Sequence, residues 1–123
     1  MKILKILVLP LILLALGGCN KLKEPSVTLL DDRFINSDVT VSPGGSLRFK
    51  WIAEKGKADL SSFTIRVNGD DSYGWPNDSI PTDVYTDSTY MEGPGVAGDY
   101  SYSFIAEDVD GNIGQVDVNV SVQ

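Results

Sequence analysis

The chain has 123 residues, of which 10 are basic, 17 are acidic and none is histidine, so its formal net charge at neutral pH is −7. This acidic balance argues against electrostatic binding to nucleic acid or to anionic lipid. The absence of histidine removes the commonest general base and the commonest transition-metal ligand. Because there is a single cysteine, no disulfide within the chain is possible.

The beginning of the chain has the order of charged and apolar residues that is typical of an export signal. Lys2 and Lys5 precede a nearly unbroken apolar run over residues 6–16. The run is shorter than the roughly 20 apolar residues that a spanning helix needs, so it is interpreted as part of a signal peptide, residues 1–18. It ends in Leu16-Gly17-Gly18-Cys19, which resembles the lipobox of bacterial lipoproteins. An ordinary secretory peptide is the alternative.

The resemblance implies that the chain is cut after residue 18 and that Cys19 is acylated. Two or more acyl chains give stable attachment to a membrane. Asn20 stands where an aspartate would resemble the inner-membrane retention signal of enteric bacteria, so the outer membrane of a Gram-negative bacterium is expected. Lys21 and Glu24 resemble the acidic surface-export signal of Bacteroidetes lipoproteins only loosely. The periplasmic and the surface face of the cell envelope therefore both stay open.

The mature chain is expected to consist of a short tether, residues 19–26, and one domain, residues 27–123. The tether is polar and carries Pro25. The leader removes two lysines and no acid, so the mature chain keeps 8 basic and 17 acidic residues, a formal charge of −9. Its 105 residues suit a single hydrophobic core.

Apolar and polar residues alternate through the mature domain with a period of two, which places each apolar set on one face of a strand. Leu47, Phe49 and Trp51, for example, alternate with Arg48 and Lys50, so Trp51 is expected in the core. No segment of the mature chain has a convincing helical period. The predicted strands, about seven, are residues 27–30, 39–41, 46–53, 60–68, 83–86 with 88–92, 99–107 and 115–122.

Turn sequences separate these strands. They are rich in glycine with proline, asparagine or aspartate, as in Pro43-Gly44-Gly45 and Asp110-Gly111-Asn112. The last two strands are expected to form a hairpin through residues 108–114. Short alternating strands with regular turns predict an all-β fold, namely a two-layer antiparallel β-sandwich.

Three stretches resemble bacterial immunoglobulin-like domains of the PKD-like or Bacteroidetes surface-lipoprotein kind. They are VTVSPGGSLRFKW (39–51), GVAGDYSYSFIAEDVDGNIG (95–114) and QVDVNVSV (115–122). The resemblance implies that Tyr100 forms a tyrosine corner, with its hydroxyl bonded to nearby backbone. The two core cysteines of antibody-type domains are missing. Such a fold does not define a function, because these domains serve as spacers, adhesins, glycan-binding modules and subunits of assemblies.

The turn that follows the predicted strand 99–107 has some of the residues of a calcium loop. Asp108 and Asp110 offer carboxylates, but an EF-hand needs glycine at its sixth place and glutamate at its twelfth. Those places hold Ile113 and Asn119. The favoured interpretation is a hairpin turn, in which Asp-Gly-Asn adopts positive φ angles easily. A calcium site that pools Asp108 and Asp110 with distant carboxylates is the alternative, and no other cofactor is expected.

The longest irregular segment is expected at residues 70–81, and long loops are often functional. A tryptophan in a polar loop can stack on the apolar face of a sugar, while the neighbouring polar side chains accept hydrogen bonds from hydroxyl groups. In the alternative interpretation Trp75 folds back as a plug over one end of the sandwich. The candidate ligand residues are Asp70, Asp71, Tyr73, Trp75, Asn77 and Asp78.

No arrangement typical of an enzyme is found in the sequence. An activated nucleophile needs a neighbouring base, and the chain has neither histidine nor a Gly-x-Ser-x-Gly sequence. We therefore expect a membrane-anchored, non-catalytic binding or structural module with a protein or glycan partner and no nucleic acid. The alternative is a carbohydrate-binding accessory lipoprotein that uses the Trp75 loop. A third hypothesis is a spacer, or a subunit that joins a complex through an exposed edge strand.

Overall fold

The computed structural model describes residues 23–70 and 76–123. The predicted signal peptide and Cys19 lie outside the described residues, as do Asp71, Tyr73 and Trp75 of the predicted ligand loop. Within the described ranges no helix is long and apolar enough to cross a membrane. These ranges contain strands and connecting turns without any helix, which confirms the predicted all-β class.

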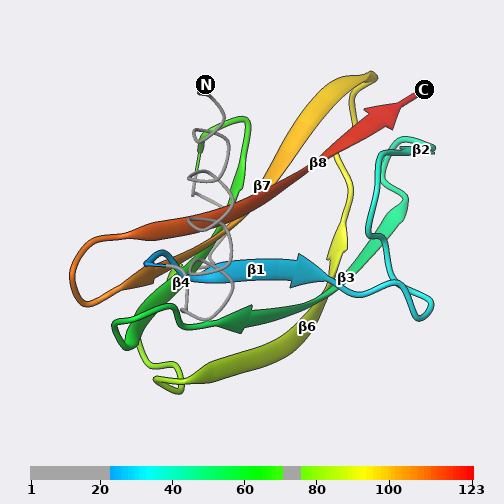
Figure 1. Cartoon of the computed structure of the whole chain (residues 1–123). Coiled ribbons are helices and arrows are strands. Elements are labelled where there is room, and N and C mark those ends of the chain that lie inside the picture. Colours follow the sequence, from blue (N-terminus) through cyan, green and yellow to red (C-terminus); the bar gives the residue numbers. More distant parts are fainter. Residues whose placement is uncertain (1–22, 71–75) are drawn as a thin grey trace, which may run out of the picture.

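The first layer of the described fold is a three-stranded antiparallel sheet in the order β1-β3-β6. The central β3 pairs along nine consecutive positions with β6, from Ser46 opposite Glu92 to Glu54 opposite Val84. Figure 1 shows the three strands side by side in the lower half of the molecule. Their bounds are β1 Ser26–Leu29, β3 Ser46–Glu54 and β6 Val84–Glu92.

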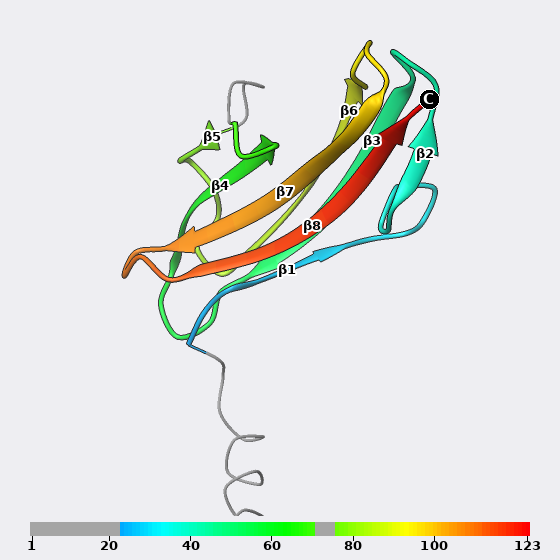
Figure 2. The ribbon, with the colours of Figure 1, turned by 90° about the horizontal axis from the view of Figure 1, so that it is seen from above.

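The second layer, among the described residues, is a five-stranded sheet in the order β2-β8-β7-β4-β5. Its strands pair antiparallel except for β2, which runs parallel to β8. Figure 2 shows the long β7 and β8 running together beside β4. The bounds are β2 Val39–Val41, β4 Leu60–Val67, β5 Pro76–Asn77, β7 Gly98–Asp108 and β8 Ile113–Val122.

The predicted strands agree with the structure, and the differences are local. The hairpin predicted through residues 108–114 is confirmed, since β7 and β8 pair from Gly98 opposite Val122 to Glu107 opposite Ile113. The segments predicted as 83–86 and 88–92 form one continuous strand, β6. The short β5 lies inside the segment predicted as irregular, because Pro76 and Asn77 pair with β4.

Aromatic side chains from both layers fill the space between the sheets. Trp51 of β3 stacks on Phe63 of β4, with 4.7 Å between ring centroids and 13° between ring planes. Phe49 lies 4.8 Å from Phe104 and 5.6 Å from Tyr102, centroid to centroid. All five side chains are fully buried, which confirms that Trp51 is in the core. Each such ring buries roughly 150–250 Å², so these contacts fix the two sheets against each other.

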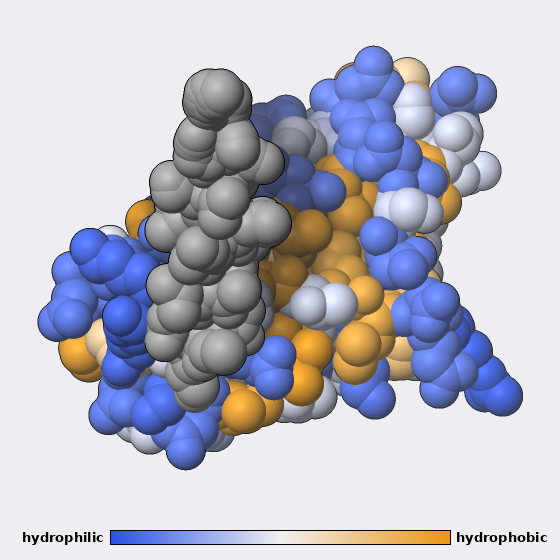
Figure 3. Space-filling model, in the orientation of Figure 1, coloured by the Kyte–Doolittle hydropathy of each residue, from blue (hydrophilic) through white to orange (hydrophobic). Residues whose placement is uncertain are grey.

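The side of the sandwich between β1 and β8 is less completely closed. Figure 3 shows hydrophobic residues gathered there, between hydrophilic surfaces above and below. Val27 of β1 and Val116 of β8 are only partly buried against the core. The β8 backbone at Gly114 lies directly against the carbonyl group of Pro25, the residue before β1.

Candidate functional sites

The turn between β7 and β8 is organised by the carboxylate of Asp108, which is only 2% exposed. Its Oδ1 accepts hydrogen bonds from the backbone N–H groups of Asp110 (2.9 Å) and Asn112 (2.8 Å). Its Oδ2 accepts a further bond from Asn112 Nδ2 at 3.1 Å. Gly111 takes a positive φ of 85°, as the predicted Asp-Gly-Asn turn requires.

These hydrogen bonds determine the charge state of Asp108. Burial by itself would raise the pKa of the Asp108 carboxyl group, but the bonds from Asn112 and Asp110 outweigh it and hold the pKa below its ordinary value of 3.8. The carboxylate therefore serves the turn, as the favoured interpretation expects. Asp110 is exposed, and the described residues contain no group of three acidic or sulfur side chains suited to a metal ion. Calcium binding by Asp108 and Asp110 stays a prediction.

The described part of the predicted ligand loop falls into two separate places. Asp70 closes a two-residue turn after β4, in which its backbone exchanges hydrogen bonds with Val67 and in which Asn68 and Gly69 have positive φ angles. Asn77 pairs instead with Phe63, four residues before Val67. Along a strand four residues cover roughly 13 Å, so Asp70 and Asn77 are not brought to one point.

Asn77 joins the edges of the two sheets through Tyr85. Its Nδ2 lies 3.5 Å from the Tyr85 hydroxyl oxygen, and its Oδ1 accepts a bond from the Ser79 N–H at 3.0 Å. The Tyr85 hydroxyl donates to Asp87 Oδ2 at 2.8 Å. Burial, reinforced by the neighbouring Asp87, raises the pKa of Tyr85 to about 12. The Asn77 side chain is thus engaged in the fold, whereas Asp78 is exposed.

A cluster on the outer face of the three-stranded sheet was not predicted from the sequence. The Arg48 guanidinium carbon lies 5.4 Å from the Tyr90 ring centroid and 5.6 Å from that of Phe34. The two rings meet edge to face at 6.4 Å, and Arg48 also donates to the Arg33 carbonyl oxygen. Tyr90 remains 63% exposed. In the sequence, only the alternation of polar and apolar residues around Arg48 indicated this outer face. Tyr90 reaches it through the register of β3 with β6, which local sequence does not show.

Two hollows border the three-stranded sheet. One, of about 320 Å³, is lined by Tyr90 with Ser46 and Glu92 among others. The other, of about 430 Å³, lies at the opposite end of the sheet and includes Glu54 and Lys55 in its lining. Both are bordered by hydroxyl or charged groups, so each offers hydrogen bonds to a polar ligand.

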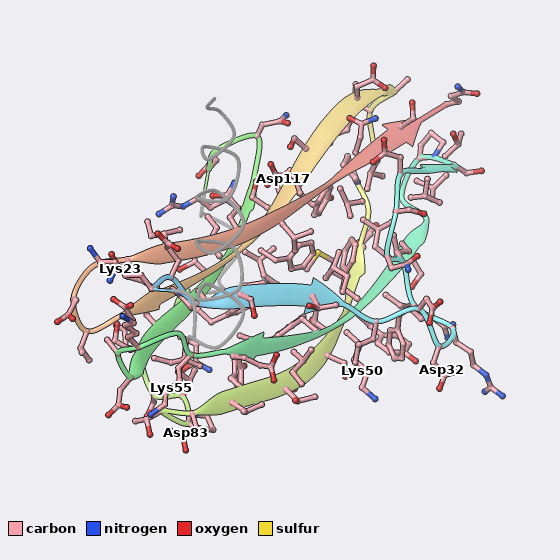
Figure 4. The ribbon with its side chains drawn as sticks, viewed as in Figure 1. Lys23, Asp32, Lys50, Lys55, Asp83 and Asp117 are labelled. Atoms are coloured by element: carbon pink, nitrogen blue, oxygen red, sulfur yellow. The ribbon has the colours of Figure 1, made fainter. Side chains whose placement is uncertain are left out.

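Lys55 in the second hollow is fixed by two carboxylates. Its Nζ lies 3.0 Å from Asp83 and 3.1 Å from Asp59, and Figure 4 shows Lys55 and Asp83 next to each other. Hydrogen bonds to Asp83 and Asp59 raise the pKa of Lys55 above its ordinary value. The lysine therefore stays charged and is partly neutralised by its neighbours.

Comparison with solved structures agrees with this architecture. The chain is similar to the fibronectin(III)-like modules of CbhA from Clostridium thermocellum, with 18% identity and a TM-score of 0.58 over 83% of this chain and 48% of that one. It spans about half the length of that protein chain. A CARDB domain from Pyrococcus furiosus, solved with di-metal ions, gives 16% identity and a TM-score of 0.47 over 85% of this chain and 100% of that one.

No protein-family model matches the chain, and no curated protein matches it. At 18% identity the likeness to the fibronectin(III)-like modules shows the fold alone. The fold is an immunoglobulin-like β-sandwich, as the sequence predicted. The Tyr100 hydroxyl donates to the Val96 carbonyl oxygen at 2.8 Å, which confirms the predicted tyrosine corner.

Proposed function

We propose that the chain is a membrane-anchored lipoprotein of the cell envelope, of the PKD-like surface-lipoprotein kind. Its sandwich is a non-catalytic binding or structural module. The observation that carries the proposal is that Lys23, four residues after Cys19 of the lipobox-like sequence, already contacts the folded domain through the Lys57 N–H. An anchor followed so closely by a module suits a protein whose task is to hold a binding surface near a membrane.

The first described residues support this arrangement because they are packed against the sandwich. The Lys57 N–H lies 3.5 Å from the Lys23 carbonyl oxygen, Pro25 is buried, and Ser26 already pairs with Glu54 in the sheet. Residues 23–26 of the expected tether therefore lie against the sandwich. The module would be held close to the lipid rather than suspended at the end of a long linker.

Lipid attachment is tested in a Gram-negative host that expresses the full chain together with an alkyne-bearing palmitate analogue. We expect the analogue on the wild-type chain and the chain in outer-membrane fractions. The Cys19→Ser variant should lose the label and leave the membrane fraction. A wild-type chain that is exported without any label would contradict the lipoprotein part of the proposal. Hydrolysis of an envelope polymer by the purified chain would contradict the non-catalytic part.

A carbohydrate-binding accessory role is the second candidate, and the exposed ring of Tyr90 favours it. Tyr90 borders a hollow together with Ser46 and Glu92, so a ring face and hydrogen-bonding groups lie side by side, as in sites that bind sugars. The sequence offers Trp75 as a second aromatic group for the same purpose. Both residues are candidates for the same class of ligand.

A glycan screen with the Tyr90→Ala and Trp75→Ala variants shows which of these two aromatic residues binds the sugar. Binding that is lost in only one variant, with unchanged thermal unfolding, would assign the site. Binding that disappears with a chelator would favour the carboxylates Asp108 and Asp110. If no glycan binds, a protein partner is favoured, and affinity purification from envelope extracts identifies it.

A further inference from the structure

The hairpin between β7 and β8 exposes two aliphatic side chains. Val109 is 64% exposed and Ile113 is 51% exposed. The turn that carries them is held by the three hydrogen bonds to the buried Asp108. The two side chains leave apolar surface in contact with water at the tip of an acidic domain. A membrane could cover this apolar surface.

This tip lies at the end of the sandwich where the described chain begins. The Val109 N–H donates to the Asp59 carbonyl oxygen at 2.9 Å, and the Lys57 N–H faces the Lys23 carbonyl oxygen. Gly114 packs against the Pro25 carbonyl group. Figures 1 and 4 show the hairpin, the start of β1 and Lys23 together at the left of the molecule. We call residues 23–25, 55–59 and 108–114 the Lys23 end.

The covalent chain limits the distance between this end and a lipid attached to Cys19. Four peptide units separate Cys19 from Lys23. Since consecutive Cα atoms lie about 3.8 Å apart, the two Cα atoms are separated by about 15 Å at most. An acylated Cys19 would lie at the membrane surface, so the Lys23 end would be within reach of the headgroup region.

We propose that the hairpin tip inserts Val109 and Ile113 into the interfacial region of the membrane that holds the anchor. The inference rests on the proposed lipid attachment of Cys19, and it goes further because it assigns the orientation of the domain. The contact would hold the sandwich in one orientation, with its opposite end directed away from the membrane and free to meet a partner.

The charges of the Lys23 end indicate which attraction drives this contact. Lys23, Lys55 and Lys57 are offset there by acidic neighbours, and Lys55 is already paired with Asp59. No basic surface that would select anionic lipid is formed by these described residues. The insertion should therefore depend on apolar area and change little with salt concentration.

The opposite end supplies a matched control. Val96 in the loop between β6 and β7 is 72% exposed. Val96 lies just before the start of β7, and Val109 follows the end of β7. The 11 residues of β7 cover roughly 35 Å, so the two valines are far apart. Asp110 and Ala97 are exposed neighbours of Val109 and Val96, so a probe can be attached at either end without replacing the aliphatic side chain.

The test uses the full chain, purified from membranes and reconstituted in vesicles of phosphatidylethanolamine and phosphatidylglycerol. A polarity-sensitive fluorophore is attached to Asp110→Cys or to Ala97→Cys, and a nitroxide-bearing lipid serves as quencher. The unsubstituted chain is the labelling control, because an acylated Cys19 has no free thiol. We expect a blue-shifted, quenched probe at residue 110, at low and at high salt, and a water-exposed probe at residue 97.

Adding Val109→Ser and Ile113→Ser to Asp110→Cys should abolish the shift and the quenching, which excludes insertion by the fluorophore itself. Equal signals at residues 110 and 97, or a signal at residue 110 that survives the two serines, would overturn the inference while lipid attachment stands. Failure of the lipid anchor itself gives a different result. If the unsubstituted chain takes up the fluorophore and carries no palmitate, the proposed lipid anchor is wrong, and the inference is wrong with it.

Discussion

The two ends of the sandwich are closed by similar turn sequences but by different interactions. At the Lys23 end a buried carboxylate, Asp108, gathers the donors of one hairpin, and Gly114 lets the backbone of β8 touch Pro25. At the other end, the Tyr100 end, backbone atoms of two separate turns bond to each other. Gly44 donates to the Pro94 carbonyl oxygen and Gly93 to that of Gly45.

The difference shows that a turn sequence determines the local chain direction but not what supports the turn. The turn at the Lys23 end depends on a buried carboxylate that accepts three hydrogen bonds. At the Tyr100 end the bonds between the two turns and the Tyr100 corner are neutral, and the Asp99 carboxylate accepts an exposed hydrogen bond from the Ser121 hydroxyl group. The two ends should therefore respond differently to pH and to added side-chain volume.

The largest effect is expected for Gly114→Val at the Lys23 end. The new Cβ would collide with the carbonyl oxygen of Pro25, which is a backbone atom, so the chain that leads into β1 would have to move. We expect a loss of about 3 kcal/mol in the free energy of unfolding, measured by urea denaturation with tryptophan fluorescence. Gly95→Val is the control, because nothing lies within 4 Å of a Cβ at Gly95. Equal midpoints for both variants would contradict the close approach.

A smaller loss is expected for Gly93→Val at the Tyr100 end. A Cβ there would lie 2.8 Å from the Gly45 carbonyl oxygen and 3.5 Å from the Leu47 side chain. This approach is less close than the one at Gly114, so we expect a loss of about 2 kcal/mol in the same measurement. A loss that exceeds that of Gly114→Val would reverse the comparison between the ends.

The pH dependence distinguishes the ends most directly. Because the pKa of Asp108 is lowered in the folded state, its contribution is complete above 3.8 and is lost as the pH falls through the folded pKa. Asp108→Asn should lower the urea midpoint at neutral pH, and the difference from wild type should shrink in acid. A difference that is constant from neutral to acidic pH would show that the charge has no role in the turn.

The smallest effect is expected for Tyr100→Phe. The change removes one hydrogen bond, from the Tyr100 hydroxyl to the Val96 carbonyl oxygen, and leaves the ring in place. We expect a loss of about 1 kcal/mol that does not vary between neutral and acidic pH. If the loss follows the same pH curve as Asp108→Asn, the contrast between the ends is wrong.

The strands, the hairpin and the two layers could be predicted from the amino-acid sequence alone. Alternation over a few residues, as in Leu47 to Trp51, depends only on which face of a strand meets the core. The Asp108 turn was predictable because its hydrogen bonds join residues that are close in sequence. The Tyr100 corner was implied by the resemblance to immunoglobulin-like domains. The fold class followed because such local preferences all favoured the same architecture.

Which distant residues meet became known only from the folded structure. Arg48 and Tyr90 are 42 positions apart and become neighbours through the register of β3 with β6. Asn77 reaches Tyr85 only because β5 pairs with β4 at the open edge. The Lys23 end likewise joins three segments that no local pattern connects. Contacts of this kind depend on strand order and register, which are set by how the whole core packs.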